Sequence, residues 1–332
     1  MTGKNVGHMI VDFMHIYYKY KFLAESGRIK RLTSTTPQGV EDVTLIYYVI
    51  KDIEALRKGL EAKYGPSGAM IALTICMDNK PSVRLEETGS EQYKKNRKHS
   101  LTEEDHRNIE VIAEMLRIAG YKVLSIPGYE ADDLIAFLVL TGHSTDTTPP
   151  NGKDLFGASF IYTNDSDMLA YVLPNKSHVF VRRQKEGYIE ATHQNFTEVT
   201  GRLIGHELPF NTVMLYKSLV GDKSDNIPGV KGFGDAAFDK LIANREEWLW
   251  NGGFDVKFFN YPMTLQRWFE ECAWTYLEDW QIEQAMQSFE LVRPRGSAEL
   301  AKTIRLSDVA GISTEDRRKS AYLDTYGFKS LV

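Results

Sequence analysis

The chain has 332 residues, a net charge of −5, and 42% hydrophobic and 26% charged residues. This size and composition are typical of a folded protein with two domains. They exclude a membrane span, because no apolar run of about 18 residues occurs, and the first residues lack the pattern of a secretory signal. Cys76 and Cys272 are far apart and have no metal-ligand spacing, so we expect a reduced, intracellular protein.

The first part of the chain alternates short apolar runs with helical patterns. This alternation predicts a mostly parallel sheet covered by helices on both faces, an α/β fold. Buried strands are expected at 7–14, ending at Asp12, and at 69–78, 121–128 and 158–167, with helices at 15–25, 40–63 and 107–120. A glycine stop at Gly120 ends the last of these helices. Residues 178–183 and 187–192 are expected to form a hairpin around Gly187.

After about residue 200 the pattern changes to a helix, a loop, a glycine-rich turn and another helix, and the rest is aromatic-rich and helical. We therefore expect a first domain over 1–200 and a helical domain over 201–332. The polar segment 142–157 is expected to be a surface loop. Neither that loop nor the residues beyond about 245 carry a motif to which we assign a role.

Acidic residues follow the predicted strands. Ligand sites in such sheets lie at the carboxyl ends of the strands, so we expect these acids to converge on one edge. Carboxylates this close raise each other's pKa unless hard divalent cations such as Mg²⁺ or Mn²⁺ separate them. Two ions about 4 Å apart can activate water and stabilise a leaving oxygen in phosphodiester cleavage. The acids at strand ends are Asp12, Asp78, Glu130, Asp132, Asp133, Asp165 and Asp167.

Each acid also has an ordinary structural interpretation. A single aspartate at a strand end is more often a cap or a turn former. Asp132 and Asp133 suit the N-terminus of a helix through its dipole, and TNDSD at 163–167 suits an Asx-turn. Asp222 and Asp225 suit a loop. Their joint placement favours a metal site.

The turn IPGVKGFG at 227–234 has glycines spaced to expose backbone N–H groups at the start of a helix. Such a turn can hold a phosphate, and Lys231 and Lys240 can add contacts to a DNA backbone that do not depend on base sequence. A surface helix–turn–helix without a ligand is the alternative.

A basic stretch, YKKNRKH at 93–99, follows the strand that ends at Asp78. Its cations suit a polyanionic substrate above the acidic edge, and the Tyr93 ring can stack on an unpaired base. A solvated run of charge is the alternative.

Together these motifs resemble the structure-specific 5′-nucleases, the flap endonuclease and 5′→3′ exonuclease superfamily, and within it the phage ribonuclease H type. The motifs GYEADD and GDKSDNIPGVKGFG are specific in combination. Phe13 follows Asp12 where many relatives have glycine. The motifs are IVDF at 10–13, MDNKPSVR at 77–84, YKKNR at 93–97, GYEADD at 128–133, TNDSD at 163–167 and GDKSDNIPGVKGFG at 221–234.

The resemblance implies a PIN-like core, a helical C-terminal region with a helix-turn-helix element that grips duplex DNA, and a role for each matching residue. Lys94 and Arg97 would contact the scissile phosphate, and Lys19 would be a further basic contact. A first metal ion would be held by Asp12, Asp78, Glu130 and Asp132, and a second by Asp165, Asp167 and Asp225, with Asp133 and Asp222 in support. DNA contacts would include Tyr93, Lys95, Gly229, Val230, Lys231, Gly232, Gly234 and Lys240, with K⁺ possible at the turn.

The implied activity is a Mg²⁺-dependent 5′→3′ exonuclease and flap endonuclease acting on branched, flapped or nicked duplex DNA and RNA–DNA hybrids. It would remove RNA primers in lagging-strand replication, in the cytoplasm of a bacterial host if the chain is phage-encoded. A single-strand-binding protein or a sliding clamp would be its partner. One alternative is a PIN-type ribonuclease for single strands, which leaves the glycine turn without a task. The other is a non-catalytic junction binder, which would have lost some ligand acids.

Overall fold

The computed structural model describes residues 7–36, 39–64, 71–79, 101–142, 157–243, 262–271, 273–295, 297–305, 309 and 311–331. The chain divides into two compact units. Unit 1 comprises Met1–Lys80, Ser100–Asn164 and Ala298–Val332, and unit 2 comprises Pro81–His99 and Asp165–Ser297. The domain boundary expected at residue 200 stays a prediction.

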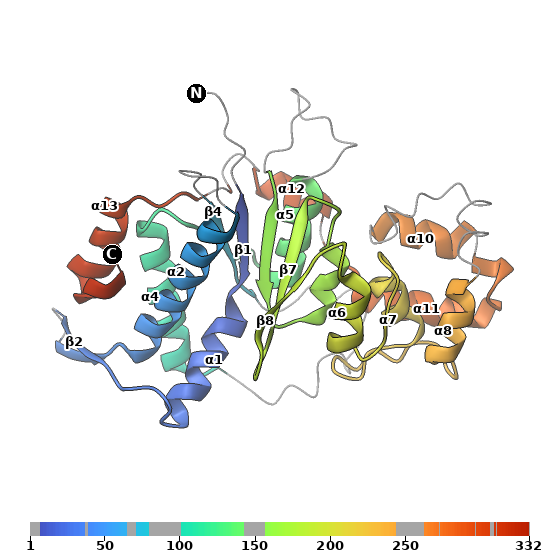
Figure 1. Cartoon of the computed structure of the whole chain (residues 1–332), viewed down its shortest axis with the longest axis horizontal. Coiled ribbons are helices and arrows are strands. Elements are labelled where there is room, and N and C mark those ends of the chain that lie inside the picture. Colours follow the sequence, from blue (N-terminus) through green and yellow to red (C-terminus); the bar gives the residue numbers. More distant parts are fainter. Residues whose placement is uncertain are drawn as a thin grey trace. The chain divides into compact units, whose positions relative to one another are not determined.

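Unit 1 is built on parallel strands in the order β5-β4-β1-β6, of which β1 and β4 lie side by side in Figure 1. The strands are β1 (His8–Asp12), β4 (Ala72–Cys76), β5 (Lys122–Leu124) and β6 (Ser159–Thr163). Every residue of β4 and β6 is buried, as are the first four of β1. Strands with both faces buried read as continuous apolar runs, which is why the sequence predicts them.

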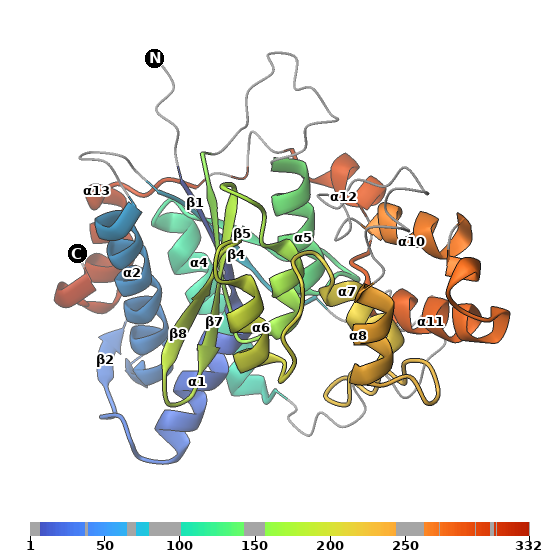
Figure 2. The same ribbon diagram turned by 45° about the vertical axis from the view of Figure 1, so that its right-hand side comes forward.

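Helices cover both faces of these strands. They are α1 (Phe13–Glu25), α2 (Thr44–Tyr64), α4 (Glu103–Ile118) and α5 (Ala131–Gly142). Figures 1 and 2 show α2 and α4 on one side of β1 and β4, and α5 on the other. The predicted fold class, a mostly parallel sheet between layers of helices, is confirmed.

Three helix starts differ from the sequence prediction, and the first helix, expected from residue 15, begins at Phe13. The helix expected from residue 40 begins at Thr44, because the residues before it form an antiparallel pair of strands, β2 (Thr33–Thr36) and β3 (Gly39–Asp42). The Asp42 carboxylate accepts a 2.9 Å hydrogen bond from the Thr44 N–H and so fixes the helix start. The helix expected from residue 107 begins at Glu103, behind a capping box formed by Thr102 and Asp105.

The end of the chain returns to unit 1. It contains α12 (Ser297–Thr303), α13 (Glu315–Arg318), the π-helical turn η5 (Lys319–Asp324) and η6 (Lys329–Leu331). The Leu73 N–H donates to the Gly311 carbonyl at 2.9 Å, beside β4. The Tyr322 hydroxyl donates to the buried Glu54 carboxylate at 3.0 Å. These contacts group the end of the chain with unit 1.

Unit 2 contains the antiparallel hairpin β7 (Ser177–Arg183) and β8 (Gly187–Ala191), which confirms the hairpin predicted around Gly187. Its other elements are helical, and α11 packs against α7. They are η1 (Ser166–Tyr171), α6 (Phe196–Leu203), α7 (Val213–Leu219), α8 (Asp235–Ala243), α10 (Pro262–Glu271), η3 (Ala273–Thr275) and α11 (Asp279–Val292). Of the helices that the structure describes, none combines the length and the apolar character needed to cross a bilayer.

Candidate functional site

The acids of unit 1 lie at the carboxyl edge of its strands. Asp12 ends β1 and pairs in register with Cys76, the last residue of β4, and Asp78 follows two residues later. The Asp78 carboxylate accepts a 2.9 Å hydrogen bond from the N–H of Ala131, the first residue of α5. The ends of β1 and β4 and the start of α5 therefore share one edge, as the sequence predicts for these residues.

The GYEADD segment caps its own helix. The Asp133 carboxylate accepts from the Glu130 N–H at 3.1 Å, and the Asp132 carboxylate accepts from the Asp133 N–H at 2.9 Å. These bonds satisfy N–H groups that the first turn of α5 leaves open, and the helix dipole favours the negative charge. Glu130 and Asp133 are buried and Asp132 is half-buried. Asp132 and Asp133 therefore cap the start of α5, and the Asp132 side chain stays partly exposed.

Asp12 is oriented by its neighbours. The Thr163 hydroxyl, at the end of β6, donates to Asp12 Oδ2 at 2.9 Å. The His15 ring contacts the Asp12 carbonyl from the first turn of α1. Thr163 therefore holds the Asp12 carboxylate, while His15 contacts the backbone of the same residue.

The acids of unit 2 come from η1 and from the loop after α7. The Asp165 carboxylate accepts from the Asp167 N–H at 2.9 Å, which is the Asx-type turn considered for TNDSD. The Asp222 carboxylate accepts from the Ser224 N–H at 2.7 Å. Asp225 is buried.

Lys217 on α7 is a polar residue that the sequence analysis did not identify. Its ammonium donates to Asp167 and, at 2.5 Å, to Asp222, and its side chain is 5% exposed. Burial alone would raise the pKa of Asp222, but the Lys217 ammonium and the hydrogen bonds from Ser224 together hold that pKa below its ordinary value. A lysine in a mostly apolar helix, five residues before an aspartate, is the signal that could have identified this contact.

The carboxylates suit a hard divalent cation by their chemistry, since they offer only oxygen donors. Within the described ranges, however, no three His, Cys, Asp or Glu side chains are grouped closely enough to hold an ion together. In unit 1 the carboxylates are bonded to backbone N–H groups and to Thr163, and in unit 2 Lys217 bridges Asp167 and Asp222. The predicted ligand set stays a prediction.

The glycine-rich turn between α7 and α8 depends on a close backbone approach. Gly221 and Gly229 both have positive φ, 88° and 65°. A Cβ on Gly229 would lie 2.5 Å from the Gly221 nitrogen, so no larger residue fits. The glycines at these two positions are explained by packing.

Several amides of this turn already have protein acceptors, which differs from the expected phosphate cradle. The Gly229 N–H donates to Ser288 Oγ at 3.1 Å, and the Lys231 N–H donates to Gln284 Oε1 at 2.8 Å, both on α11. The N–H of Val230, a buried residue, donates to the Leu219 carbonyl at 2.7 Å. Four of the DNA contacts expected in this turn and on α8 are exposed, namely Gly232, Gly234, Lys231 and Lys240.

The predicted basic residues are in part outside the described region. Tyr93, Lys94, Lys95 and Arg97 all lie outside the described residues. The Lys19 ammonium forms a 2.6 Å ion pair with Asp52, and the side chain is 17% exposed. The charge of Lys19 is therefore already partly neutralised within the protein.

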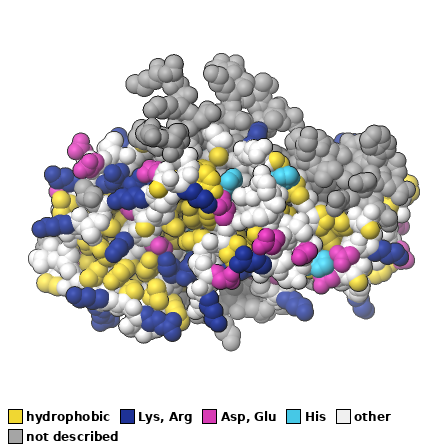
Figure 3. Space-filling model, viewed as in Figure 1, with side chains coloured by type: hydrophobic (Ala, Val, Ile, Leu, Met, Phe, Trp, Pro, Cys, Tyr) yellow, Lys and Arg dark blue, Asp and Glu magenta, His cyan; other side chains and the backbone are white. Residues whose placement is uncertain are grey.

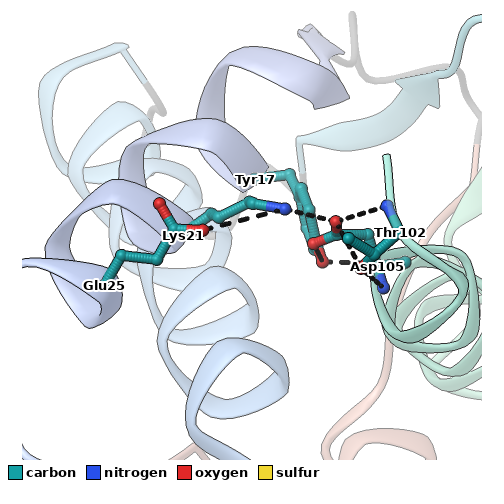
Figure 4. A network of polar contacts seen from close by, with 5 residues as sticks. All are labelled: Tyr17, Lys21, Glu25, Thr102 and Asp105. Carbon is teal, nitrogen blue, oxygen red and sulfur yellow. Dashed lines mark hydrogen bonds and ion pairs between the residues drawn. The ribbon is translucent and has the colours of Figure 1, made fainter. Parts of the chain in front are cut away.

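A buried polar network joins α1 to the start of α4 (Figure 4). The Asp105 carboxylate accepts from the Tyr17 hydroxyl at 2.8 Å and from the Thr102 N–H at 2.8 Å, and it is paired with Lys21. Burial by itself would raise the pKa of Asp105, but the bonds from Lys21, Thr102 and Tyr17 hold it well below the ordinary range. The network therefore holds the start of α4 against α1. In the sequence, α4 follows residues 80–100, which include the predicted basic stretch.

Charge is mixed on the surface that Figure 3 shows. Lys and Arg side chains are interspersed there with Asp and Glu and with apolar side chains, and neither sign covers this face. This agrees with the small net charge of −5.

Comparisons with known proteins agree with one another. The family described as "5'-3' exonuclease, N-terminal resolvase-like domain" matches residues 8–201, more than half of the chain. The thermostable DNA polymerase I of Thermus aquaticus is 32% identical over 243 residues, which are 72% of this chain and 24% of that protein. A 5'-3' exonuclease of Aquifex aeolicus is 32% identical over 126 residues, 38% of this chain and 37% of that one. The chain thus spans about a quarter of the polymerase and well under half of the exonuclease.

A solved structure shows the same fold. The T5 D15 protein, crystallised with metal ions, matches with a TM-score of 0.54 over 95% of this chain and 98% of its own. At 18% identity this likeness concerns the fold alone.

Proposed function

The chain belongs to the 5'-3' exonuclease family, and from this premise we propose that it is a metal-dependent 5′-nuclease that cuts flapped, branched or nicked duplexes. The observation that carries the proposal is the shared edge of unit 1, inside the matched residues: Asp12 ends β1, Asp78 follows β4, and Asp78 is bonded to the GYEADD segment. Acids at the carboxyl ends of parallel strands are where such folds place their chemistry.

The ligand assignment is part of the proposal. One divalent ion, Mg²⁺ or Mn²⁺, would be held by Asp12, Asp78, Glu130 and Asp132, and another by Asp165, Asp167 and Asp225, with Asp133 and Asp222 in support. Bound ions supply positive charge for the attacking and leaving oxygens of phosphodiester hydrolysis. The oxygen-only donor set and the metal ions crystallised with the T5 D15 protein support this assignment.

The chain's own residues position the nucleic acid. Lys94 and Arg97 neutralise charge on the scissile phosphate, and Tyr93 and Lys95 contact the strand beside it. The exposed Gly232, Gly234, Lys231 and Lys240 hold the duplex backbone, with K⁺ as an additional ion at the turn. Contacts of this kind recognise phosphate and shape, so no base sequence is preferred.

The proposed task is removal of RNA primers and adjacent DNA in lagging-strand replication, inside a cell and with a single-strand-binding protein or clamp as partner. A ribonuclease for single strands is the less favoured alternative, because the α7–turn–α8 element, braced by α11, would then have no duplex to bind. A junction binder without activity is less favoured because every expected acid is present.

The test uses a 5′-labelled flap duplex, a nicked duplex and a single-stranded RNA of equal length, with Mg²⁺ or with EDTA. Cleavage near the junction, dependent on Mg²⁺ and leaving a 5′-phosphate, supports the proposal. Cleavage confined to the RNA strand identifies the ribonuclease, and binding without cleavage identifies the junction binder. Lys94→Ala should slow single-turnover cleavage more than it weakens binding, and an unchanged rate would refute the role of Lys94.

A further inference from the structure

We propose that Lys217 is a built-in cation of the unit 2 acids: it holds Asp167 and Asp222 together in the metal-free protein, and a divalent ion must displace it to bind there. The inference rests on the proposed function, because it takes these aspartates to be near the ion. It assigns a role to a lysine outside every motif that the sequence analysis singled out.

The burial of Lys217 requires such a role. Lysine ammonium groups are almost never buried without a partner, because removal of the charge from water costs several kcal/mol. All residues of α7 are buried, and the Lys217 side chain is 5% exposed. Its ammonium compensates this cost by contacting two carboxylates, Asp167 from η1 and Asp222 from the loop after α7. These two acids would repel each other without a cation between them.

The bonds of Asp222 show why an ion and the lysine compete. Asp222 Oδ1 accepts from both the N–H and the hydroxyl of Ser224, at 2.7 and 2.5 Å. These two bonds occupy both lone pairs of that oxygen. Asp222 Oδ2 is the atom that accepts from Lys217. A divalent ion that binds Asp222 Oδ2 would share that oxygen with the ammonium, and the repulsion between two positive charges on one oxygen favours displacement of the ammonium.

The consequence is that Lys217 weakens divalent-ion binding at unit 2 while it stabilises the metal-free fold. This differs from a purely structural role, in which loss of the lysine would disorder the carboxylates and weaken ion binding. The two roles predict opposite changes in affinity.

The test compares Lys217→Met with Lys185→Met, which removes one positive charge from an exposed residue between β7 and β8 of the same unit. Thermal unfolding in EDTA measures the metal-free fold, and Mn²⁺ titration followed by electron paramagnetic resonance measures ion binding without DNA. Lys217→Met should unfold at a lower temperature in EDTA and bind one Mn²⁺ about tenfold more tightly. Lys185→Met should match the wild type in both measurements. Mn²⁺ affinity that is unchanged or weaker in Lys217→Met, or an unchanged unfolding temperature, would overturn the proposal.

A second measurement uses the wild-type protein, in case Lys217→Met does not fold. Reductive methylation followed by peptide mass spectrometry reports how accessible each lysine is. Lys217 should be protected in EDTA and more reactive at saturating Mn²⁺, whereas Lys185 should react equally in both. Equal protection of Lys217 in both conditions overturns the displacement. Neither measurement depends on DNA cleavage. A protein that gives the expected Mn²⁺ binding and lysine reactivity but does not cut a flap therefore contradicts only the proposed function.

Discussion

The Asp78 carboxylate accepts a 2.9 Å hydrogen bond from the Ala131 N–H, and so joins the end of β4 to the start of α5. The same aspartate is thus a helix cap and a proposed metal ligand. The two roles depend on different properties of the side chain: capping needs an oxygen acceptor, and ion binding needs negative charge.

Two substitutions at Asp78 separate these roles. Asp78→Ala loses the acceptor and should lower the free energy of unfolding by about 1 kcal/mol. Asp78→Asn keeps an oxygen for Ala131 and should unfold like the wild type. Both should cut a flap duplex at least about 100-fold more slowly, because both lose the charge. Urea unfolding and single-turnover cleavage are the measurements. Full activity in Asp78→Asn would exclude the carboxylate as a ligand.

Asp105 should make stability depend on pH. Its pKa in the folded protein lies below the value of about 3.9 expected for the unfolded chain. The ionised carboxylate therefore contributes its full stabilisation above about pH 4, and this contribution is lost as pH falls through the folded-state pKa. Asp105→Asn should lower the free energy of unfolding by about 1–3 kcal/mol at pH 7, because the half-buried Lys21 then loses a charged acceptor.

The measurement is urea unfolding of the wild type and Asp105→Asn between pH 7 and pH 3. The difference between them should be constant down to about pH 4 and shrink below it. Glu103→Gln, an exposed acid in the first turn of α4, is the matched control and should change stability by less than about 1 kcal/mol. A difference that grows on acidification would contradict the account of this network.

Gly311 should be intolerant of any side chain. A Cβ there would lie 2.3 Å from the Lys122 nitrogen, which is backbone and cannot move aside. Gly311→Ala should therefore lower the free energy of unfolding by more than about 2 kcal/mol. A Cβ added at Gly59, in the middle of α2, would point into open space, so Gly59→Ala should stabilise by about 0.5–1 kcal/mol. Denaturant midpoints that fall equally for both would show that the end of the chain is not tied to unit 1.

Lys231 and Lys240 should contribute to duplex binding through charge alone. Both are exposed, on the turn before α8 and on α8 itself. Replacement of each by Ala should reduce the slope of log affinity against log salt by about one. Lys302→Ala, an exposed lysine on α12 in unit 1, is the control and should leave the slope unchanged. A slope that does not change for Lys231→Ala and Lys240→Ala would remove both from the interface.

Local patterns predicted the strands of unit 1 because both faces of those strands are buried, and the β7–β8 hairpin because Gly187 separates two short strands. The β2–β3 pair was missed because Thr33–Thr36 carries no apolar alternation. The start of α4 was missed although Thr102 and Asp105 have the spacing of a capping box.

Other features depend on partners distant in sequence and cannot be found from local patterns. The bond from Leu73 to Gly311, which returns the end of the chain to β4, joins residues in different halves of the sequence. The contact of Lys217 with Asp167 spans 50 positions. The acids could be predicted as a group because parallel strands bring their ends together, but the amide or cation that each one meets depends on tertiary packing.

The most direct test of the central claim is a crystal grown with Mn²⁺ at a concentration that supports flap cleavage, examined for anomalous scattering. The account predicts manganese peaks beside the carboxylates of Asp12 and Asp132 in unit 1 and of Asp165 and Asp167 in unit 2. Crystals that show no manganese at either group would contradict it.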